Sequence, residues 1–551
     1  MIMKKLTSML MMALAVSAQS VRAAEGDTIK VVFSDTSAEV TIPTTASVKS
    51  VINGANVTLV SSSTKEEYVY DVYGSTTNGS LTITGDYKLT LCLNDVNIQS
   101  GNGAAIDVEC GKRIAVELVG TNTLVDAVGG KQKAAFYTTG HPEFSGGGTL
   151  NVTGNAKHAI SAKEYLLIKK TVGTINVLSA VSDGIHCGKG KVANENNYFK
   201  MNGGVVNIMN VGGDCVDSDD YGTIIVKGGS LNLNVSGTEV EGLKADSVLT
   251  IEGGTINITV TGQESTGIRS CYESHFNGGN VMIDVQGDGS KGIKGKQQTN
   301  KTVNNGGSVY LNGTEIDILV SGGTVYEETD TTKCMGISVD ADLVHTAGSV
   351  NILACGTDAY TYHVKGTTEV LADSFITNSI PWTYTPYAYQ YDMTAYVSLT
   401  VDGEAADYSQ YAVGAFVGDE CRGVAIFTTQ EDYTWGEMRI RSNQANEEVV
   451  TFKAYDLTTG DEYDCAETVD FVSQSVEGLP SSPFALSITT KQTLLGDLDK
   501  DGRITVNDVT ILIAYYLDSE FVADGDMDGD GKITVNDVTL LIEVYLSASA
   551  E

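Results

Sequence analysis

Residues 228–260 read GGSLNLNVSGTEVEGLKADSVLTIEGGTINITV and contain one phrase twice. The phrase is two glycines, a strand of alternating apolar residues and a polar turn, and the short strand Gly242-Leu243 separates its two copies. Strands of period two that recur roughly every 25 residues between Gly, Asn and Asp turns are typical of a β-solenoid, whereas a propeller blade needs about 40–45 residues. The pattern predicts a mainly β fold with a right-handed parallel β-helix over residues 25–374. The aliphatic residue of the short strand returns at Ile160, Ile185, Val216, Leu243, Ile268, Ile293 and Ile337.

Three further segments lie outside the repeat. Residues 1–24 carry Lys4 and Lys5, a short apolar run and small residues, which is the pattern of a signal peptide. Residues 375–490 alternate irregularly and predict a small β-sandwich. Residues 491–551 contain a duplication with amphipathic helical spacing after each copy, which predicts a C-terminal pair of loop-helix units.

The net charge and hydropathy of the sequence limit the kinds of partner that the protein is expected to bind. Acidic residues outnumber basic ones by 70 to 35, and the formal net charge of the 551 residues is −35. Such a polyanion is repelled by nucleic acid and by anionic membrane surfaces, so neither is an expected partner. No stretch after the signal is long enough to span a bilayer, so no membrane insertion is expected. The protein is expected to be secreted, outside the cell or at its surface.

The duplicated tail carries two loops with the spacing of EF-hand calcium loops. Positions 1, 3, 5 and 12 are aspartates in both copies, position 6 is glycine, and position 7 supplies a backbone carbonyl. Four carboxylates without a cation repel one another, so folding of the tail should depend on Ca²⁺. The predicted ligands are Asp497, Asp499, Asp501, Arg503 and Asp508 in the first loop and Asp526, Asp528, Asp530, Lys532 and Asp537 in the second.

Aligning the short strands places charged residues in columns, and neighbouring coils should lie about 4.8 Å apart. A carboxylate patch of Asp183, Asp214, Asp217 and Glu241 should therefore adjoin a basic stripe of Lys244, Arg269 and Lys294. The patch is a candidate Ca²⁺ site, and the stripe, with His186, is a candidate contact for an acidic polysaccharide. Alternatively, the opposite charges satisfy each other on a solvated face. Another column, expected to be structural, contains Asn151, Asn176, Asn207, Asn232 and Asn257.

The tail, at about residues 494–547, resembles a dockerin module, because it is a tandem loop-helix pair with Asp at position 12 and no helix before the first loop. The resemblance implies Ca²⁺ binding and docking onto a cohesin-like domain of a scaffold or surface protein. Val506-Asn507 and Val535-Asn536 stand where many dockerins carry Ser-Thr.

Residues 81–106 (LTITGDYKLTLCLNDVNIQSGNGAAI), the phrase Ser182-Asp-Gly-Ile-His186 and residues 253–260 (GGTINITV) resemble a family of secreted bacterial carbohydrate-binding β-helix proteins. The likeness spans about residues 66–370. The family is related in shape to pectate lyases, and the resemblance implies Ca²⁺, cellulose and acidic polysaccharide as ligands. Its Asp-Asp-Gly-Ile-His phrase maps onto Asp183 and His186, with Ser182 in place of the first Asp.

These features favour an exported, calcium-dependent protein that binds an acidic or cellulosic plant polysaccharide and is attached to a complex or surface by its tail. The first alternative is a pectate-type polysaccharide lyase, because the carboxylates beside Lys244 and Arg269 could supply Ca²⁺ and a base. The second is an adhesin or structural spacer rod. A run of near-equivalent basic positions without a nucleophilic triad favours binding over catalysis.

Overall fold

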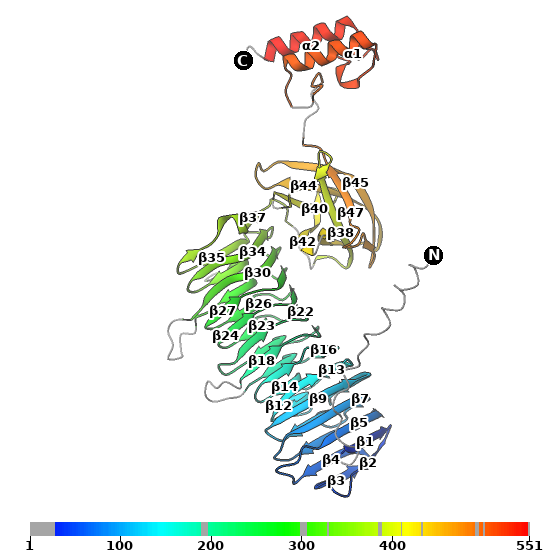
Figure 1. Ribbon diagram of the computed structural model, residues 1–551, viewed down its shortest axis with the longest axis vertical. Coiled ribbons are helices and arrows are strands. Elements are labelled where there is room, and N and C mark those ends of the chain that lie inside the picture. Colours follow the sequence, from blue (N-terminus) through cyan, green and yellow to red (C-terminus); the bar gives the residue numbers. More distant parts are fainter. Residues whose placement is uncertain are drawn as a thin grey trace, which may run out of the picture. The chain divides into compact units, whose positions relative to one another are not determined.

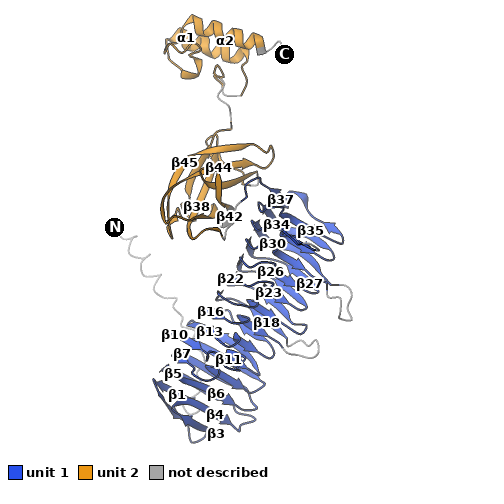
Figure 2. Cartoon of the chain, turned by 180° about the vertical axis from the view of Figure 1, so that it is seen from behind, with its two compact units in different colours: residues 1–387 blue, residues 388–551 orange. Residues whose placement is uncertain are grey.

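The computed structural model describes residues 28–188, 197–297, 306–327, 330–383, 388–408, 410–430, 433–490, 495–499 and 502–548, so the predicted signal peptide lies outside it. The chain forms two compact units, residues 1–387 and residues 388–551 (Figure 2). Unit 1 is built almost entirely of strands, and unit 2 contains strands and two α-helices. The predicted mainly β class is confirmed.

Unit 1 is a stack of coils, and most coils contribute one strand to each of three parallel ladders (Figure 1). Ladder 1 contains β10 (Thr121–Val125), β13 (Thr149–Gly154), β16 (Thr174–Ala180), β19 (Val205–Ile208), β22 (Ser230–Val235), β25 (Thr255–Val260), β28 (Asn280–Val285) and β37 (Phe375–Ser379). Ladder 2 contains β4 (Ala55–Ser61), β6 (Gly79–Thr84), β8 (Ile106–Glu109), β11 (Ala134–Thr138), β14 (His158–Ala162), β17 (Ile185–Cys187), β20 (Val216–Ser218), β23 (Glu241–Ala245), β26 (Thr266–Ser270), β29 (Lys291–Gly295), β33 (Met335–Val339) and β35 (Tyr360–Val364).

Ladder 3 contains β9 (Arg113–Val119), β12 (His141–Ser145), β15 (Leu166–Ile168), β18 (Tyr198–Met201), β21 (Thr223–Val226), β24 (Val248–Ile251), β27 (Glu273–Phe276) and β36 (Thr368–Glu369). Longer strands join ladders 3 and 1 at both ends of unit 1: β1 (Thr28–Ser34), β5 (Val69–Thr76), β7 (Leu89–Gln99), β30 (Ser308–Val320) and β34 (Leu343–Ala354). These long parallel sheets are consistent with the predicted parallel β-helix. The parallel pairing continues through β37, beyond the boundary predicted at residues 374/375. Residues 28–379 are called the parallel stack below.

Two antiparallel hairpins form the N-terminal end of the parallel stack. β1 pairs with β2 (Ser37–Thr41), and β3 (Val48–Asn53) pairs with β4. Small elements lie near the other end, namely the hairpin of β31 (Val325–Tyr326) and β32 (Thr331–Thr332) and a 3₁₀ turn at Ala372–Ser374.

The core of the parallel stack is a continuous ladder of aliphatic side chains. In ladder 2, Ile185, Val216, Leu243, Ile268 and Ile293 pair in register, and all are completely buried. Each coil therefore buries the same inward positions against its neighbours, which explains the period of the sequence. The register predicted from the short strands is confirmed.

The turns between ladders 3 and 1 need glycine for two reasons. Gly229 and Gly254 have φ of 93° and 94°, in the left-handed region that other residues rarely adopt. A Cβ at Gly254 would also lie 2.7 Å from the carbonyl oxygen of Gly229 in the coil before it. The paired glycines of the repeat thus allow the backbones of successive coils to approach closely.

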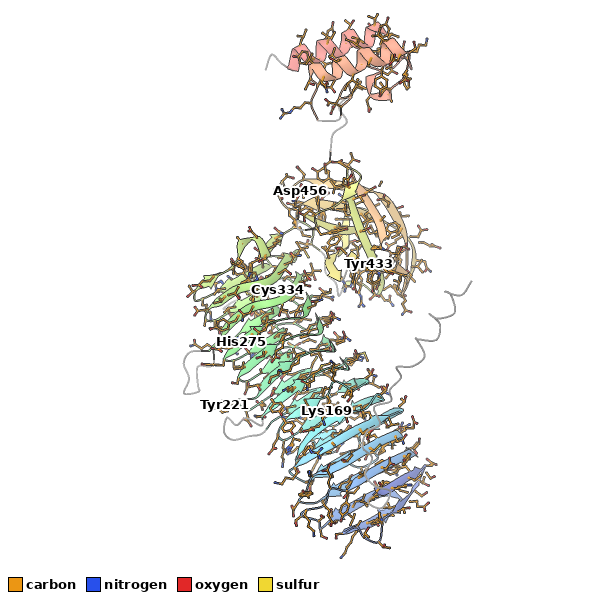
Figure 3. The ribbon with its side chains drawn as sticks, in the orientation of Figure 1. Lys169, Tyr221, His275, Cys334, Tyr433 and Asp456 are labelled. Carbon is orange, nitrogen blue, oxygen red and sulfur yellow. The ribbon has the colours of Figure 1, made fainter. Side chains whose placement is uncertain are left out.

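All nine cysteines are unbridged, and eight are buried. Cys334, labelled in Figure 3, is completely buried in the core of the parallel stack. Burial raises the pKa of the Cys334 thiol to about 12, so this side chain is an inert apolar residue.

The asparagine column of ladder 1 is a chain of side-chain amides. Each Nδ2 group donates to the Oδ1 atom of the preceding coil, from Asn176 to Asn151, Asn207 to Asn176, Asn232 to Asn207 and Asn257 to Asn232, at 2.8, 2.8, 2.7 and 2.9 Å. The column runs on the outer face of the ladder and is half-buried.

Replacing Asn207 by Ala is expected to destabilise the parallel stack by about 2 kcal/mol, because two amide hydrogen bonds worth about 1 kcal/mol each are lost. Asn151 stands at the end of the column with one such bond, so Asn151→Ala should cost about half as much. Urea unfolding of the full chain measures both effects. Equal losses at the two positions would show that the amides do not act as a chain.

The strands of unit 2 form two antiparallel-rich sheets that share one apolar cluster, which includes Met393, Val413, Phe452 and Leu486. One sheet contains β38 (Tyr391–Val401), β39 (Glu404–Ala405), β42 (Ile426–Gln430), β43 (Tyr433–Ser442), β46 (Val476–Glu477) and β47 (Phe484–Ile488), and the other β40 (Tyr411–Val417), β41 (Glu420–Val424), β44 (Asn446–Asp456) and β45 (Glu462–Val472).

The two helices of unit 2 are α1 (Val506–Asp518) and α2 (Val535–Ala548), with a 3₁₀ turn at Ala523–Gly525 between them. No helix among the described residues has the length and apolar character that crossing a membrane requires.

Candidate functional site

The predicted charged column lies on the outer face of ladder 2. His186, Asp217, Lys244, Arg269 and Lys294 are partners on successive strands from β17 to β29. The second column runs parallel to it, because the backbone N–H of Asp214 donates to Asp183 and that of Glu241 donates to Asp214, at 3.0 and 2.7 Å. The structure therefore brings together all the β-helix residues predicted from the sequence as metal or glycan contacts.

The carboxylates and cations of these columns pair with one another. The Lys244 ammonium lies 2.9 Å from Asp214 Oδ2 and 3.2 Å from Asp217 Oδ1, and Arg269 forms an ion pair with Glu241. Both aspartates are buried and Lys244 is largely covered. The carboxylate patch and the basic stripe thus form ion pairs with each other. This is the arrangement that the alternative of a solvated face with paired opposite charges predicts.

Burial and the neighbouring charges change the pKa values of the groups in these columns. Burial favours the neutral lysine, but Asp217 and Asp214 outweigh it and hold the pKa of Lys244 well above its usual value. Burial and the adjacent Glu241 raise the pKa of Asp214, whereas the Lys244 ammonium opposes this rise and stabilises its carboxylate form. Lys244 is therefore a cation at every physiological pH and holds this part of the column together.

Lys294, at the other end of the stripe, has a different environment. Within the described ranges it makes no ion pair, and it interacts electrostatically with the cations Lys291, Lys296 and Arg269 and with the carboxylates Glu241 and Asp340. Burial and these cations lower the pKa of Lys294 to about 8. Among the described residues, no carboxylate at this end of the column forms an ion pair with Lys294.

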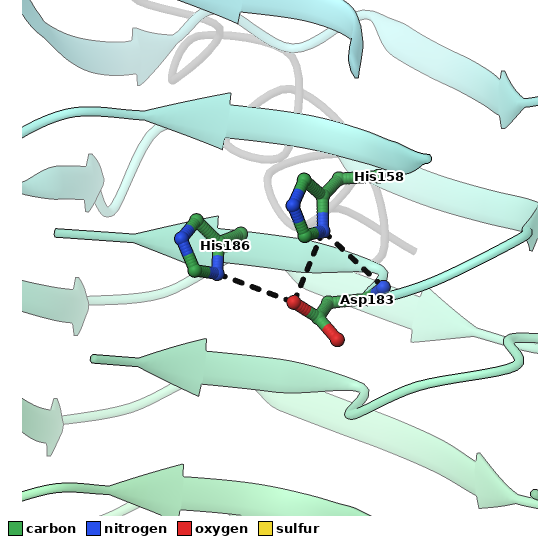
Figure 4. A group of neighbouring side chains, drawn as sticks. All are labelled: His158, Asp183 and His186. Atoms are coloured by element: carbon green, nitrogen blue, oxygen red, sulfur yellow. Dashed lines mark hydrogen bonds and ion pairs between the residues drawn. The ribbon is translucent and has the colours of Figure 1, made fainter. Parts of the chain in front are cut away.

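At the opposite end, His158, Asp183 and His186 form a compact cluster (Figure 4). Asp183 Oδ2 lies 3.0 Å from His158 Nδ1 and 3.2 Å from His186 Nδ1, and the two rings stack with centroids 4.5 Å apart. Sequence analysis missed His158. It stands two residues before Ile160, which is the position that Asp183 occupies before Ile185, so extending the column by one coil would have found it.

The two C-terminal loops bring their aspartates together. Carboxylate oxygens of Asp497, Asp499 and Asp508 lie within 4.8 Å of one another, as do those of Asp526, Asp528 and Asp537. Asp508 and Asp537 are completely buried, and Asp508 accepts backbone N–H groups of Leu498 and Asp499 at 2.7 and 3.1 Å. Asp501 lies outside the described residues.

The donor set of these loops fits calcium. All the side-chain ligand atoms are carboxylate oxygens, and Gly502 and Gly531 turn the chain at φ of 82° and 79°. The backbone N–H of Asp530 donates to both Asp526 and Asp528, which ties this part of the loop to the two carboxylates. Arg503 and Lys532 follow the glycines at the positions that supply a carbonyl ligand in EF-hand loops.

The helices after the loops leave apolar residues on their surface. α1 and α2 pack through Val509, Leu512, Val538 and Leu541. Outside this cluster, equivalent positions of the two copies stay exposed, with Val506 62% and Val535 63% exposed, and Leu517 and Leu546 71% and 58%.

Three comparisons with known proteins bear on these sites. A family model described as carbohydrate-binding domain-containing protein matches residues 53–370, and the model of the dockerin type I domain matches residues 495–545. Among solved structures, the chain is similar to a gadolinium derivative of a polysaccharide lyase-like protein from C. thermocellum, with 16% identity, a TM-score of 0.28, and coverage of 63% of this chain and 98% of that chain. No curated protein matches the chain.

Proposed function

This chain belongs to the carbohydrate-binding domain-containing protein family, and from that premise we propose that it is an exported, calcium-dependent polysaccharide-binding protein. The parallel stack would bind an acidic or cellulosic plant glycan. The dockerin type I domain would attach the protein to an extracellular complex or a cell surface. The observation that carries the proposal is Lys294, a largely covered cation that makes no ion pair in the described part of a chain whose net charge is −35.

The chemistry of this cationic end favours an acidic glycan. Arg269 and Lys294 stand on neighbouring strands about 4.8 Å apart, and Lys291 begins the same strand as Lys294. A uronic acid chain repeats its carboxylates, so a row of cations can bind it at several points. Lys244 and Arg269 are already paired with carboxylates, and Lys294 therefore supplies the open charge of the stripe.

The main proposed calcium sites are the two loops of the tail, whose ligand atoms fit the ion. In the parallel stack, Asp183, Asp214, Asp217 and Glu241 remain the proposed calcium ligands for glycan binding. There, Ca²⁺ would displace Lys244 and Arg269 from the carboxylates that these two side chains now contact. A Ca²⁺ ion held by these carboxylates would add a second positive group for an acidic sugar.

A cohesin-like domain is the proposed partner of the tail. The exposed apolar residues Val506, Leu517, Val535 and Leu546 occur at equivalent positions of the two copies and supply the apolar contact that such an interface needs.

A lyase is the second candidate, and the observation that favours it is also Lys294. A lysine with a pKa of about 8 is partly deprotonated near neutral pH, as a general base must be. The spacer rod is the third candidate, because the paired columns could serve as a solvated face alone.

We also propose the hand of the coils and the arrangement of the two sheets of unit 2. The coils are proposed to be right-handed, which is the hand that parallel crossover connections almost always adopt. Within the predicted range of residues 375–490, the part that follows β37 is proposed to form a small β-sandwich, supported by the apolar cluster that the two sheets of unit 2 share.

Electrophoresis of the full chain through gels containing polygalacturonate, with Ca²⁺ or with EDTA, tests these functions. Retardation without depolymerisation supports a binder, and its loss in EDTA supports calcium dependence. A cleared track would identify a lyase. Unchanged mobility in both gels would exclude acidic-glycan binding and leave neutral glycans or the spacer rod.

Lys294→Ala is expected to weaken retardation about tenfold or more, because a hydrogen bond to a charged group contributes about 1.5–3 kcal/mol. Retardation of the native chain should also decline as the pH rises through about 8, where Lys294 loses its charge. Lys227→Ala is the matched control, since Lys227 pairs with Glu252 away from the column. Equal losses in the two variants would contradict a specific role for Lys294.

A further inference from the structure

The outer face of ladder 1 carries no charged side chain over six consecutive coils. From β10 to β25, the buried residues are separated by outward ones that are Thr, Asn, Ser, Val or Leu (Figure 1). Over most of these coils ladder 2 carries the charged columns, and the chain as a whole has a net charge of −35. We propose that this uncharged face of ladder 1 binds a neutral polysaccharide, as a second site that rests on the proposed polysaccharide-binding function.

The amides of the asparagine column are held in place before any ligand binds. Asn176, Asn207 and Asn232 each donate one hydrogen bond to the coil before and accept one from the coil after, at 2.7–2.9 Å. A side-chain amide has two N–H groups and two acceptor lone pairs, so each of these residues keeps one of each for a ligand. The side chains are half-buried, so a ligand can reach them from solvent. Because their rotamers are already fixed, binding costs little further side-chain entropy.

A column of hydroxyl groups runs beside the amides. Thr149, Thr174, Ser230 and Thr255 are aligned on the strands of ladder 1, with Val205 in the one coil between Thr174 and Ser230. Neighbouring coils lie about 4.8 Å apart, and the two columns are two residues, or about 6.6 Å, apart along each strand. The face therefore repeats donors and acceptors in two directions. A chain of pyranose rings also repeats its hydroxyl groups, so it can bind this face at several coils at once.

The composition of the face disfavours other classes of partner. Protein interfaces are centred on Trp, Tyr and Arg, and none of these stands outward on the described strands from β10 to β25. Nucleic acid, anionic membranes and acidic glycans need cations, which these outward positions also lack. The hydroxyl groups of a neutral polymer are both donors and acceptors, so they suit the amide and hydroxyl groups that the face offers.

Two exposed apolar side chains border the uncharged face. Leu178 and Met209 directly follow the register partners Val177 and Ile208 on neighbouring strands, and they are 38% and 41% exposed. The C–H groups on the face of a sugar ring can cover these side chains and remove apolar surface from water. This contact adds to the hydrogen bonds of the two columns and lies at one edge of the same surface.

Affinity electrophoresis with a neutral polymer tests the proposal. The full chain in excess Ca²⁺ is run through gels that contain hydroxyethylcellulose or polygalacturonate, and its mobility is compared with that in a gel without polymer. Hydroxyethylcellulose should retard the native chain. Thr255→Arg should weaken this binding about tenfold or more, because the long side chain at an exposed position covers neighbouring hydroxyl and amide groups and removes two or more hydrogen bonds. Its retardation by polygalacturonate should not decrease.

Thr250→Arg is the matched control, because Thr250 is an outward threonine of β24, on ladder 3 instead of ladder 1. Urea unfolding checks that both variants fold, and Ser230→Arg, one coil before Thr255 in the same column, repeats the test if Thr255→Arg does not.

Equal retardation of Thr255→Arg and Thr250→Arg by hydroxyethylcellulose would overturn the second site. Retardation of the native chain by polygalacturonate alone would also overturn it but would leave the proposed polysaccharide-binding function standing. Retardation by neither polymer would overturn both.

Discussion

Removing calcium with EDTA should unfold the C-terminal pair of helices while the parallel stack remains folded. The tail has a small apolar cluster centred on Val509, Leu512, Val538 and Leu541. A core in a segment of this size supplies at most about 3–5 kcal/mol. Without a cation, the carboxylates that converge in each loop repel one another, and this repulsion opposes the small core.

Asp508 is the residue through which this effect should be largest. It is completely buried, and it accepts backbone N–H groups from Leu498, Asp499 and Thr505, so it fixes the loop and caps the N-terminal end of α1. Asp508→Ala should destabilise the tail by about 4 kcal/mol or more, because it removes both a metal ligand and these hydrogen bonds.

Far-UV circular dichroism of the full chain measures the loss of helix, since α1 and α2 are the α-helices of the described residues. Asp518→Asn is the matched control, because Asp518 ends α1 and is exposed to solvent. Helical signal that persists in EDTA at the level seen in Ca²⁺ would contradict calcium-dependent folding of this segment.

Two lysines of one column should respond in opposite ways to the same substitution. Lys244→Ala should destabilise the parallel stack by about 3–5 kcal/mol, because it leaves Asp214 and Asp217 buried without their cation. Lys294→Ala should leave stability unchanged or raise it, because Lys294 is a largely covered charge with cations as its near neighbours.

Urea unfolding of the full chain in excess Ca²⁺, followed by the strand signal, measures both changes. Lys227→Ala, on an exposed pair with Glu252, should change stability by less than about 1 kcal/mol and serves as the control. Equal destabilisation by Lys244→Ala and Lys294→Ala would show that the two sites have the same electrostatic environment. Because Lys294→Ala should fold normally, a loss of glycan binding in that variant can be attributed to the missing charge.

The register of the parallel stack was predictable because one coil repeats the next. A one-residue slip would place the inward aliphatic residues on the outer face, so Ile185, Val216, Leu243 and Ile268 fix the alignment of every neighbour. The asparagine column followed from the same alignment. Both depend only on backbone spacing and on the burial of apolar side chains.

The contacts within the charged column were less predictable. The sequence places Lys244 near several carboxylates, but the choice of Asp214 and Asp217 depends on side-chain rotamers and on the coil before it. His158 was missed because its coil lies before the first acidic residue of the column and carries no carboxylate at that position. The convergence of the aspartates in the C-terminal loops was simpler to predict, since their spacing in the sequence alone brings them together.

The hairpins at the N-terminal end have a consequence for solubility. Each coil of the parallel stack is complementary to its neighbours, so an open end would be a template onto which another copy could add as the next coil. β2 and β3 run antiparallel to the strands they cover, and their outer side chains are mostly exposed. A fragment that begins after Asn53 would lack both, and its uncovered strands could seed growth of fibres from chain to chain.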